Sequence, residues 1–497
     1  MPVAMSRHGT TAILVGIIII LSIFIGAIST KIYSIPIVLV VVGLLILFLV
    51  RKFFHNSVNY WFALTLLAWA ISPSFNIGNF RIEIGDILAL IGIVLFFRNT
   101  RGYWTFGFFQ RSFIIYIITG ILSVFILTWY TSSFSAGIAS DFRIFRLFAA
   151  LFMFVLVRSQ GYMQTSEAYR ILDLTIFGSV VGCIVTLIEF KLGIGMTSQQ
   201  YFTLNGVQMY RAGGTIYENA GAFGNYESIL FGISLWMTYR RRGLVMVCYF
   251  LATALFAFGA ISSYSRAAML AIAVNFLLLW IGNRGKAVSL IGVAVTTSTI
   301  IIAMNEFMHG FIAQLWMTRV VPLFSISSVQ QFNVAGGGRV TSWSNSLSFI
   351  ASHLWSLFLG IGYNGVNYAS TVFNYTMFTD NGFISSILEQ GIIGLISFTL
   401  FLFTPIVMSI RNLSRGSITW MILAIWVSEL LQSLTGDVFT FWKTIPVLFF
   451  VTAFFFSQYF MEEGGKIDVR IDHSTKLPTG KISFRLPSKY SKPTNVQ

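Results

Sequence analysis

Long apolar segments with almost no charge inside them constrain this chain more than any other feature. They recur from residue 11 to residue 460. Of the residues in the chain, 56% are hydrophobic and only 10% are charged, whereas a soluble domain has about 25% charged residues. Because no soluble core can bury so much apolar surface, the sequence predicts a polytopic membrane protein.

The segments are long and continuous, which favours helices over the short alternating strands of a membrane barrel. About fourteen can be distinguished, and crossing the hydrocarbon layer takes roughly 20 residues, so we expect an all-α bundle of about 12 to 14 transmembrane helices. The segments lie near 11–29, 35–50, 58–72, 84–98, 112–130, 143–157, 171–190, 219–238, 244–262, 267–282, 287–305, 382–409, 418–434 and 441–460.

The basic residues indicate the orientation of these helices. If the N-terminus lies in the cytosol and the helices alternate, every inner connection carries Lys or Arg, as the positive-inside rule requires. The net charge of +15 then reflects topology, and its dispersion over short loops argues against nucleic-acid binding. The same alternation places the C-terminus in the cytosol. We expect a transmembrane unit at 1–461, followed by a disordered basic tail at 462–497.

Two connections on the predicted outer face are long, at about 191–218 and 306–380. Long insertions of this kind are usually functional. Within the second, apolar residues of 344–360 recur at i, i+3, i+4 and i+7, which predicts an amphipathic helix on the membrane surface or against the bundle. Glycines at 336–338 and at 360–365 flank this helix and permit close approach of a ligand to the backbone.

Arg211 and Arg339, one in each long connection, are the leading candidates for a substrate site. An arginine is a permanent cation whose planar donors suit phosphate. Two of them at a membrane surface indicate an anionic lipid-linked substrate, and a diphosphate fits best. Arg266 and Arg319 are further outer arginines that can supply a third phosphate contact. The outer loops hold no cluster of metal-ligand residues, so we expect neither a metal nor a cofactor.

Each candidate also has a purely structural explanation. Arg211 can pair with Glu218, and Asp380 can cap the helix that begins at 382, since Asp is a favoured N-cap. Glu389 lies inside that membrane helix, where a charge is costly and usually functional. A salt bridge or a protonated carboxyl explains Glu389 equally well.

Four other residues have simpler interpretations. Arg143 and Arg146 open a membrane segment, where they can snorkel or bind lipid phosphate. Cys183 and Cys248 fall inside apolar helices, and we expect both to be buried and unpaired.

Three blocks in order resemble the O-antigen polymerase and ligase superfamily of bacterial envelope glycosyltransferases. They are RAGGTIYENAGAFGNY at 211–226, GGRVTSWSNSLSFIASHLWSLFLGIGYNG at 337–365 and TDNGFISSILEQGIIGLISFTLFL at 379–402. The third is similar to that superfamily's recurring Asn-x-aromatic, followed by Glu-x-Gly-x-x-Gly. Motifs carry the resemblance over 210–402, and hydropathy alone carries it elsewhere.

The resemblance implies transfer of a glycan from a polyprenyl diphosphate to an acceptor hydroxyl outside the bacterial cytoplasmic (inner) membrane, without a sugar nucleotide or a metal. Arg211 and Arg339 would hold the diphosphate and stabilise its developing charge, and Asp380 would act as the base. Glu218, Asn381 and Glu389 would join the substrate site. The implied partners are lipid-linked oligosaccharide, membrane lipids, a chain-length regulator and a flippase.

Departures from the superfamily's patterns bear on the reaction. Ligases carry a histidine before the Asn of the third block, where this chain has Asp380, and this favours the polymerase branch. The Arg-x10-Gly spacing described for polymerases is not met, because Ala222 and Ile350 stand where the glycines would be. A polymerase for O-antigen, capsule or exopolysaccharide is therefore favoured by overall pattern and elimination. Ligase-like transfer to a lipid acceptor and a transporter or flippase of lipid-linked saccharide remain open.

Overall fold

In a computed structural model of the chain, the described residues run from 57 to 463 with gaps. The larger gaps are 100–107, 133–143, 153–164, 194–200 and most of 284–337 and 364–379. The first two predicted membrane segments and the predicted tail beyond Glu463 lie outside the described residues.

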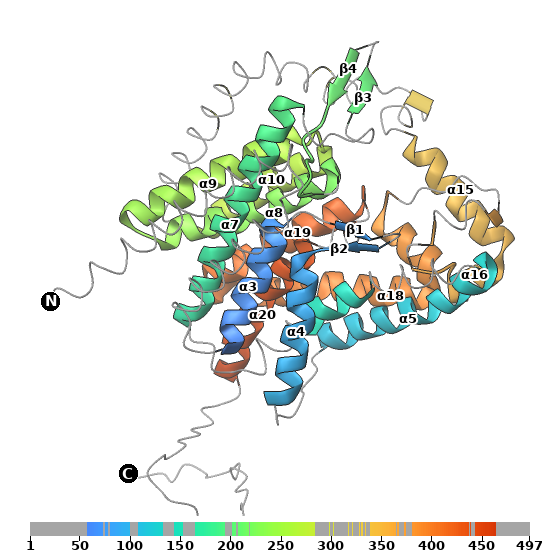
Figure 1. Ribbon diagram of the computed structural model, residues 1–497, viewed down its shortest axis with the longest axis horizontal. Helices are drawn as coiled ribbons and strands as arrows, with labels where there is room; N and C mark the ends of the chain where they lie inside the picture. Colours follow the sequence, from blue (N-terminus) through green and yellow to red (C-terminus); the bar gives the residue numbers. More distant parts are fainter. Residues whose placement is uncertain are drawn as a thin grey trace, which may run out of the picture.

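Helices dominate the described part of the chain (Figure 1). Two short antiparallel hairpins interrupt them, one pairing β1 (Phe75–Ile77) with β2 (Phe80–Ile82) and the other β3 (Tyr201–Leu204) with β4 (Val207–Tyr210). The longer helices are α3 (Ser57–Ile71), α4 (Ile84–Asn99), α5 (Phe108–Thr131), α7 (Thr165–Leu192), α8 (Ala220–Arg240), α9 (Gly243–Ser262), α10 (Arg266–Gly282), α15 (Arg339–Ser352), α16 (Leu354–Leu359), α18 (Gly382–Arg411), α19 (Ser417–Ser433) and α20 (Thr444–Glu463).

The predicted fold class, an all-α polytopic membrane protein, is confirmed. Within the described residues, α5, α7, α9 and α18 are long and apolar enough to cross a membrane, and α3, α4, α10, α19 and α20 contain shorter apolar helices. The total of 12 to 14 spans remains a prediction, because several of the counted segments fall in the gaps.

Helix α8 forms the centre of one group of helices. Every residue from Phe223 to Tyr239 is buried, and a helix that is covered on all sides belongs to the core of a bundle. Helices α9, α10, α19 and α20 surround it. Gly232 faces Asn275 of α10, and the missing side chain lets these two helices approach closely.

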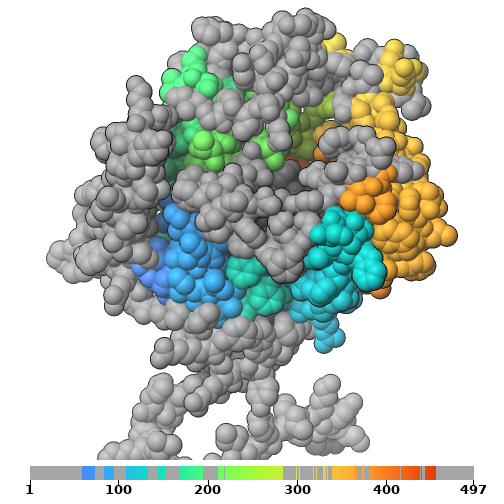
Figure 2. Space-filling model, turned by 45° about the vertical axis from the view of Figure 1, so that its right-hand side comes forward, coloured from blue at the N-terminus to red at the C-terminus, as the bar shows by residue number. Residues whose placement is uncertain are grey.

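Helices α5 and α18 form a second group, in which they run antiparallel and side by side (Figure 1). Aromatic rings hold them together: Phe113 and Tyr116 of α5 lie 5.0 and 5.6 Å from Phe401 of α18, centroid to centroid. Helices α15 and α16 contact α18, and in Figure 2 their yellow-orange surface adjoins the cyan surface of α5. The pair therefore supports the long connection that contains Arg339.

The single amphipathic helix predicted for 344–360 is wrong in its bounds. The structure has two helices, because His353 leaves the helical conformation (φ −128°, ψ 70°) and separates α15 from α16. The His353 ring stacks on Phe349 at 4.4 Å. The turn lets α16 pack against α18 instead of continuing along the axis of α15.

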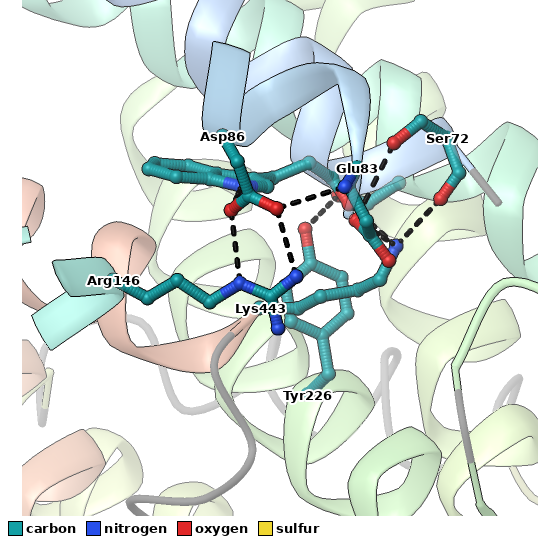
Figure 3. A network of polar contacts seen from close by, with 8 residues as sticks. Ser72, Glu83, Asp86, Arg146, Tyr226 and Lys443 are labelled. Carbon is teal, nitrogen blue, oxygen red and sulfur yellow. Dashed lines mark hydrogen bonds and ion pairs between the residues drawn. The ribbon is translucent and has the colours of Figure 1, made fainter. Parts of the chain in front are cut away.

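A buried network of four charged residues joins distant parts of the chain (Figure 3). Arg146 donates to both carboxylate oxygens of Asp86, at 3.0 and 2.7 Å, and Lys443 lies 3.3 Å from Glu83. Burial raises the pKa of Glu83 to about 7, although Lys443 and Arg146 act in the opposite direction. The snorkelling role expected for Arg146 is wrong, because this side chain is buried and paired with a carboxylate.

Candidate functional site

Arg211 follows β4 and is fixed against the turn between α9 and α10. Its Nε donates to the carbonyl oxygen of Ser263 at 2.9 Å, and the next residue, Ala212, donates from its backbone to the carbonyl of Ser262 at 3.0 Å. These two bonds hold the segment after β4 against the turn between α9 and α10, although the two segments are far apart in the sequence. Only Nε of the guanidinium is used in them, so the bonds leave its other donors for further partners.

The same turn presents Arg266, the first residue of α10. Ser265 caps this helix, and its side chain accepts from the backbone of Ala268 at 3.3 Å. Tyr264 has a positive φ of 53°, which is uncommon for a non-glycine residue and occurs at tight turns and functional sites. Arg266 therefore belongs to the same turn as Ser263, whose carbonyl oxygen accepts the hydrogen bond from Arg211.

Arg339 is the first residue of α15, and its position depends on Asn333. The N-cap residue, Gly338, has a φ of +81° and no side chain with which to cap the helix. Asn333 replaces that function: its Oδ1 accepts from the backbone of Thr341 at 3.1 Å, and its Nδ2 donates to the Thr341 hydroxyl at 2.7 Å. Sequence reasoning missed Asn333, because the residue lies well before the helix that it caps.

Asp380 pairs with Arg339 across the site, with Oδ2 3.3 Å from Nε. Asp380 does not cap α18, because Asn381 does so by accepting from the backbone of Phe383 and Ile384 at 2.9 and 3.1 Å. The Asp380 side chain is 61% exposed and that of Arg339 is 32% exposed. Since exposed pairs contribute little to stability, the pair is better placed to meet a ligand than to hold the fold together.

The charges of these four residues act on one another. Burial, together with the positive charge of Arg339, lowers the pKa of Arg211 to about 10, and Asp380 opposes the shift. Arg266 also lies within electrostatic range of Arg339. The charge of Arg339 thus acts on both Arg211 and Arg266, and Arg339 itself pairs with Asp380; we call these four residues the arginine cluster. Its excess of positive charge favours binding of an anion.

Other predicted site residues lie elsewhere. Glu218 and Arg319 fall outside the described residues. Asn381 has a structural role, since it caps α18 and donates from Nδ2 to the carbonyl of Leu434 at 2.9 Å. Glu389 is buried within α18 at 4% exposure, two turns beyond Asp380.

In the part of the chain that the structure describes, no three His, Cys, Asp or Glu residues are grouped to hold a metal ion. Cys183 is buried and Cys248 is half-buried, and neither forms a disulfide.

The fold and this site define a class: a helical membrane protein in which connections between helices assemble a cationic cluster. Residues 251–399 match the family model Wzy_C, described as O-antigen ligase. This match spans the second sequence block and most of the third, while the block at 211–226 lies before it, and it is consistent with the resemblance to the O-antigen polymerase and ligase superfamily. The match includes Arg266, Arg339 and Asp380. A comparison with curated proteins gave no significant match.

The family sets the coarse function. Its members transfer glycosyl groups and act on lipid-linked saccharides in membranes. The chain therefore has an O-antigen ligase-like or polymerase-like function.

Proposed function

We propose that this protein polymerises lipid-linked oligosaccharide repeat units on the outer side of the bacterial cytoplasmic membrane. It transfers a glycan from polyprenyl diphosphate to an acceptor sugar hydroxyl, in the synthesis of O-antigen, capsule or exopolysaccharide. The observation that carries the proposal is the arginine cluster, in which Arg339 pairs with Asp380 and its positive charge acts on Arg211 and Arg266. A diphosphate supplies the negative charge that this cluster lacks.

The arginines act on the leaving group. As the acceptor oxygen attacks the anomeric carbon, the bond from that carbon to the diphosphate breaks and its electron pair remains on the diphosphate oxygen. Guanidinium donors fixed before the reaction stabilise this charge as it develops. Arg211 is suited to this role because its contact with Ser263 holds it in place. The guanidinium groups can provide this stabilisation without a metal ion.

Asp380 takes the proton of the acceptor hydroxyl. Its carboxylate pairs with Arg339. A diphosphate that binds Arg339 competes with this pairing, because a dianionic group offers the guanidinium a stronger charge-assisted contact. Donor binding would therefore release Asp380 for the acceptor, and it would couple the base to the presence of the leaving group.

Two other functions remain candidates. Ligase-like transfer to a lipid acceptor would use the same cluster, and the aspartate at position 380, where ligases of the superfamily carry histidine, is the feature that favours polymerisation. A transporter of lipid-linked saccharide would also need an anion site. The residues of the arginine cluster lie at the ends of helices and in the connections between them, whereas transporter sites lie near the midplane of a bundle.

Reconstitution separates these functions. Purified protein in liposomes would be given a polyprenyl-diphosphate-linked oligosaccharide, alone or with a lipid-linked acceptor glycan of different structure. Products that lengthen by whole repeats indicate a polymerase, and a single transfer to the second acceptor indicates a ligase. Exchange of the donor between leaflets without any new glycosidic bond would contradict the proposal and indicate a transporter. A chain-length regulator and a flippase are the expected partners in the cell.

A further inference from the structure

Helix α18 is interrupted in its first half. At Gly391 the backbone leaves the helical conformation (φ 71°, ψ −169°), so residues 382–390 form a separate half-helix that begins next to Asp380. A break in a membrane helix frees backbone carbonyls to which lipid cannot donate hydrogen bonds. The break therefore requires donors from elsewhere in the protein.

The segment that follows α16 supplies these donors. The backbone of Ile361 donates to the carbonyl of Leu388 at 2.9 Å, and the backbone of Gly362 donates to the carbonyl of Glu389 at 3.1 Å. Each of these two irregular stretches would be unstable alone in a membrane, and here the backbone N–H groups of one donate to the backbone carbonyls of the other. We call the contact between residues 360–363 and 388–391 the junction.

Two glycines make the junction possible. Gly360 and Gly391 both have a φ of +71°, in the left-handed region that side chains disfavour. A Cβ atom at Gly360 would collide with the backbone of Glu389, and one at Gly391 with the backbone of Phe358. Because backbone atoms cannot move aside as the end of a flexible side chain can, both positions require glycine.

Helix α5 contacts the junction, and the position of these contacts along α5 indicates how deep in the membrane the junction lies. Thr119 lies midway along α5 and donates to the side chain of Gln390 at 2.8 Å, so the break is level with the middle of a helix long enough to cross a membrane. The hydroxyl of Ser123, one turn further, accepts from the backbone of Tyr363 at 2.9 Å. At 1.5 Å per residue, Ser123 lies about 12 Å from the end of α5 at Thr131.

The exposed side chains of α16 fit this depth. Leu354, Phe358 and Leu359 are 65%, 64% and 52% exposed, although α16 packs against α18 on its other side. Large apolar side chains exposed at the depth of a membrane core are covered by lipid, and they need no protein partner there.

We propose that residues 339–363 form a re-entrant membrane element, anchored at the junction, and that this anchor positions Arg339 against Asp380. The element packs against α18 along α16, and it is fixed to residues 380–391 by the hydrogen bonds of the junction and by the Arg339–Asp380 pair, so a shift at the junction is transmitted to the pair. Ser123 and Gly391 are therefore positioning residues. This inference deepens the proposed function and rests on it for its catalytic consequence.

The first measurement addresses the junction alone. Ser123→Ala removes the acceptor for Tyr363, and Tyr130→Phe removes a hydroxyl that donates to the carbonyl of Ile361. The matched control is Ser112→Ala on the same helix, because the Ser112 hydroxyl donates to the carbonyl of Phe108 within α5.

Spin labels would be attached at Leu347 of α15 and Leu122 of α5, both exposed, in a Cys183→Ser, Cys248→Ser background in nanodiscs. Electron–electron double resonance should give one narrow distance distribution in the control and a broader or shifted one in the Ser123→Ala, Tyr130→Phe variant. An unchanged distribution in that variant would overturn the inference, whatever the activity of the protein.

The second measurement separates positioning from folding. Losing one hydrogen bond at the junction should slow chain elongation about fivefold, and losing both about thirtyfold. In an Asp380→Asn background the same substitutions should slow elongation less, because one member of the pair that they position is already disabled. An equal loss in both backgrounds would contradict the positioning role. If the unaltered protein elongates no chains, the proposed function fails, and the distance measurement still decides the junction.

Discussion

Arg339 and Asp380, 41 residues apart in the sequence, face each other with Nε 3.3 Å from Oδ2. Each stands at the start of a helix, Arg339 as the first residue of α15 and Asp380 just before α18. Neither is consumed by capping, because Asn333 and Asn381 accept the bonds that a cap would accept. The arrangement leaves a cation and a carboxylate available to a ligand at the same point.

Asp380→Asn should lower the rate of elongation while leaving the amount of folded protein nearly unchanged. Asparagine keeps the size of the side chain but cannot accept a proton, and the lost pair with Arg339 is exposed and contributes little to stability. Positioned proton transfer typically accounts for about 100-fold or more in rate, so a decrease of that size is expected. The measurement is elongation at saturating donor, and full activity would remove the base assignment.

Glu83 should make the stability of the protein depend on pH. Its pKa is raised from 4.5 to about 7 in the folded protein, chiefly by burial, so between these values the folded state binds more protons than the unfolded state. The free energy of unfolding should therefore fall as pH rises through this window, by up to about 1.4 kcal/mol per pH unit, and level off above it.

The test is unfolding of the detergent-solubilised protein from about pH 4.5 to 8, with Glu83→Gln as the comparison. Glutamine keeps the shape of the side chain but does not titrate. The free energy of unfolding of the Glu83→Gln protein should therefore change less with pH than that of the unaltered protein. Parallel curves for both proteins would show that Glu83 does not titrate in this range.

Arg146→Ala should destabilise the fold strongly. It removes the cationic partner of the buried Asp86 carboxylate, which keeps the hydrogen bonds from Trp69 and from the backbone of Glu83, and removing one member of a buried pair typically costs about 3–5 kcal/mol. Arg242→Ala, at an exposed position, is the control and should change the free energy of unfolding by less than about 0.5 kcal/mol. Similar stability of the two variants would mean that Asp86 becomes neutral or finds another partner.

The orientation of the protein can be tested with reporters. A topology reporter fused after Arg242 or Arg415 should be active only in the cytosol, and one inserted near Arg339 only outside, because the basic connections are expected to face inward. Cytosolic accessibility of the Arg339 region would place the arginine cluster on the wrong side for a donor that has already crossed the membrane.

The fold class and the family could be predicted from the sequence because each depends on local patterns. Continuous apolar segments identify membrane helices without knowledge of their neighbours, and the blocks at 337–365 and 379–402, which the family match reaches, are each contiguous in the sequence. The pairing of Asp86 with Arg146 was not predictable, since nothing local couples residues 60 positions apart. The same holds for Lys443, which meets Glu83 near the opposite end of the described chain.

Finer features of the site also depended on tertiary contacts. The sequence offers two adjacent favoured N-cap residues before α18, and only the structure shows that Asn381 caps the helix while Asp380 turns to Arg339. The break at Gly391 was equally hidden, because glycine is tolerated inside membrane helices. It is stable only where residues 360–363 supply the missing donors.

The central claim, that Arg211 and Arg339 grip a diphosphate, is tested most directly by elongation kinetics of arginine variants in proteoliposomes. Lysine keeps the charge but loses the planar fork, so Arg211→Lys and Arg339→Lys should each slow elongation roughly 100-fold, and the alanine variants more.

Because both arginines act on one group, the double variant should be less impaired than the product of the two single effects. Membrane levels of each variant would be checked alongside. Slowing in all four single variants with this non-additivity supports the diphosphate site, whereas wild-type elongation by both alanine variants would contradict it.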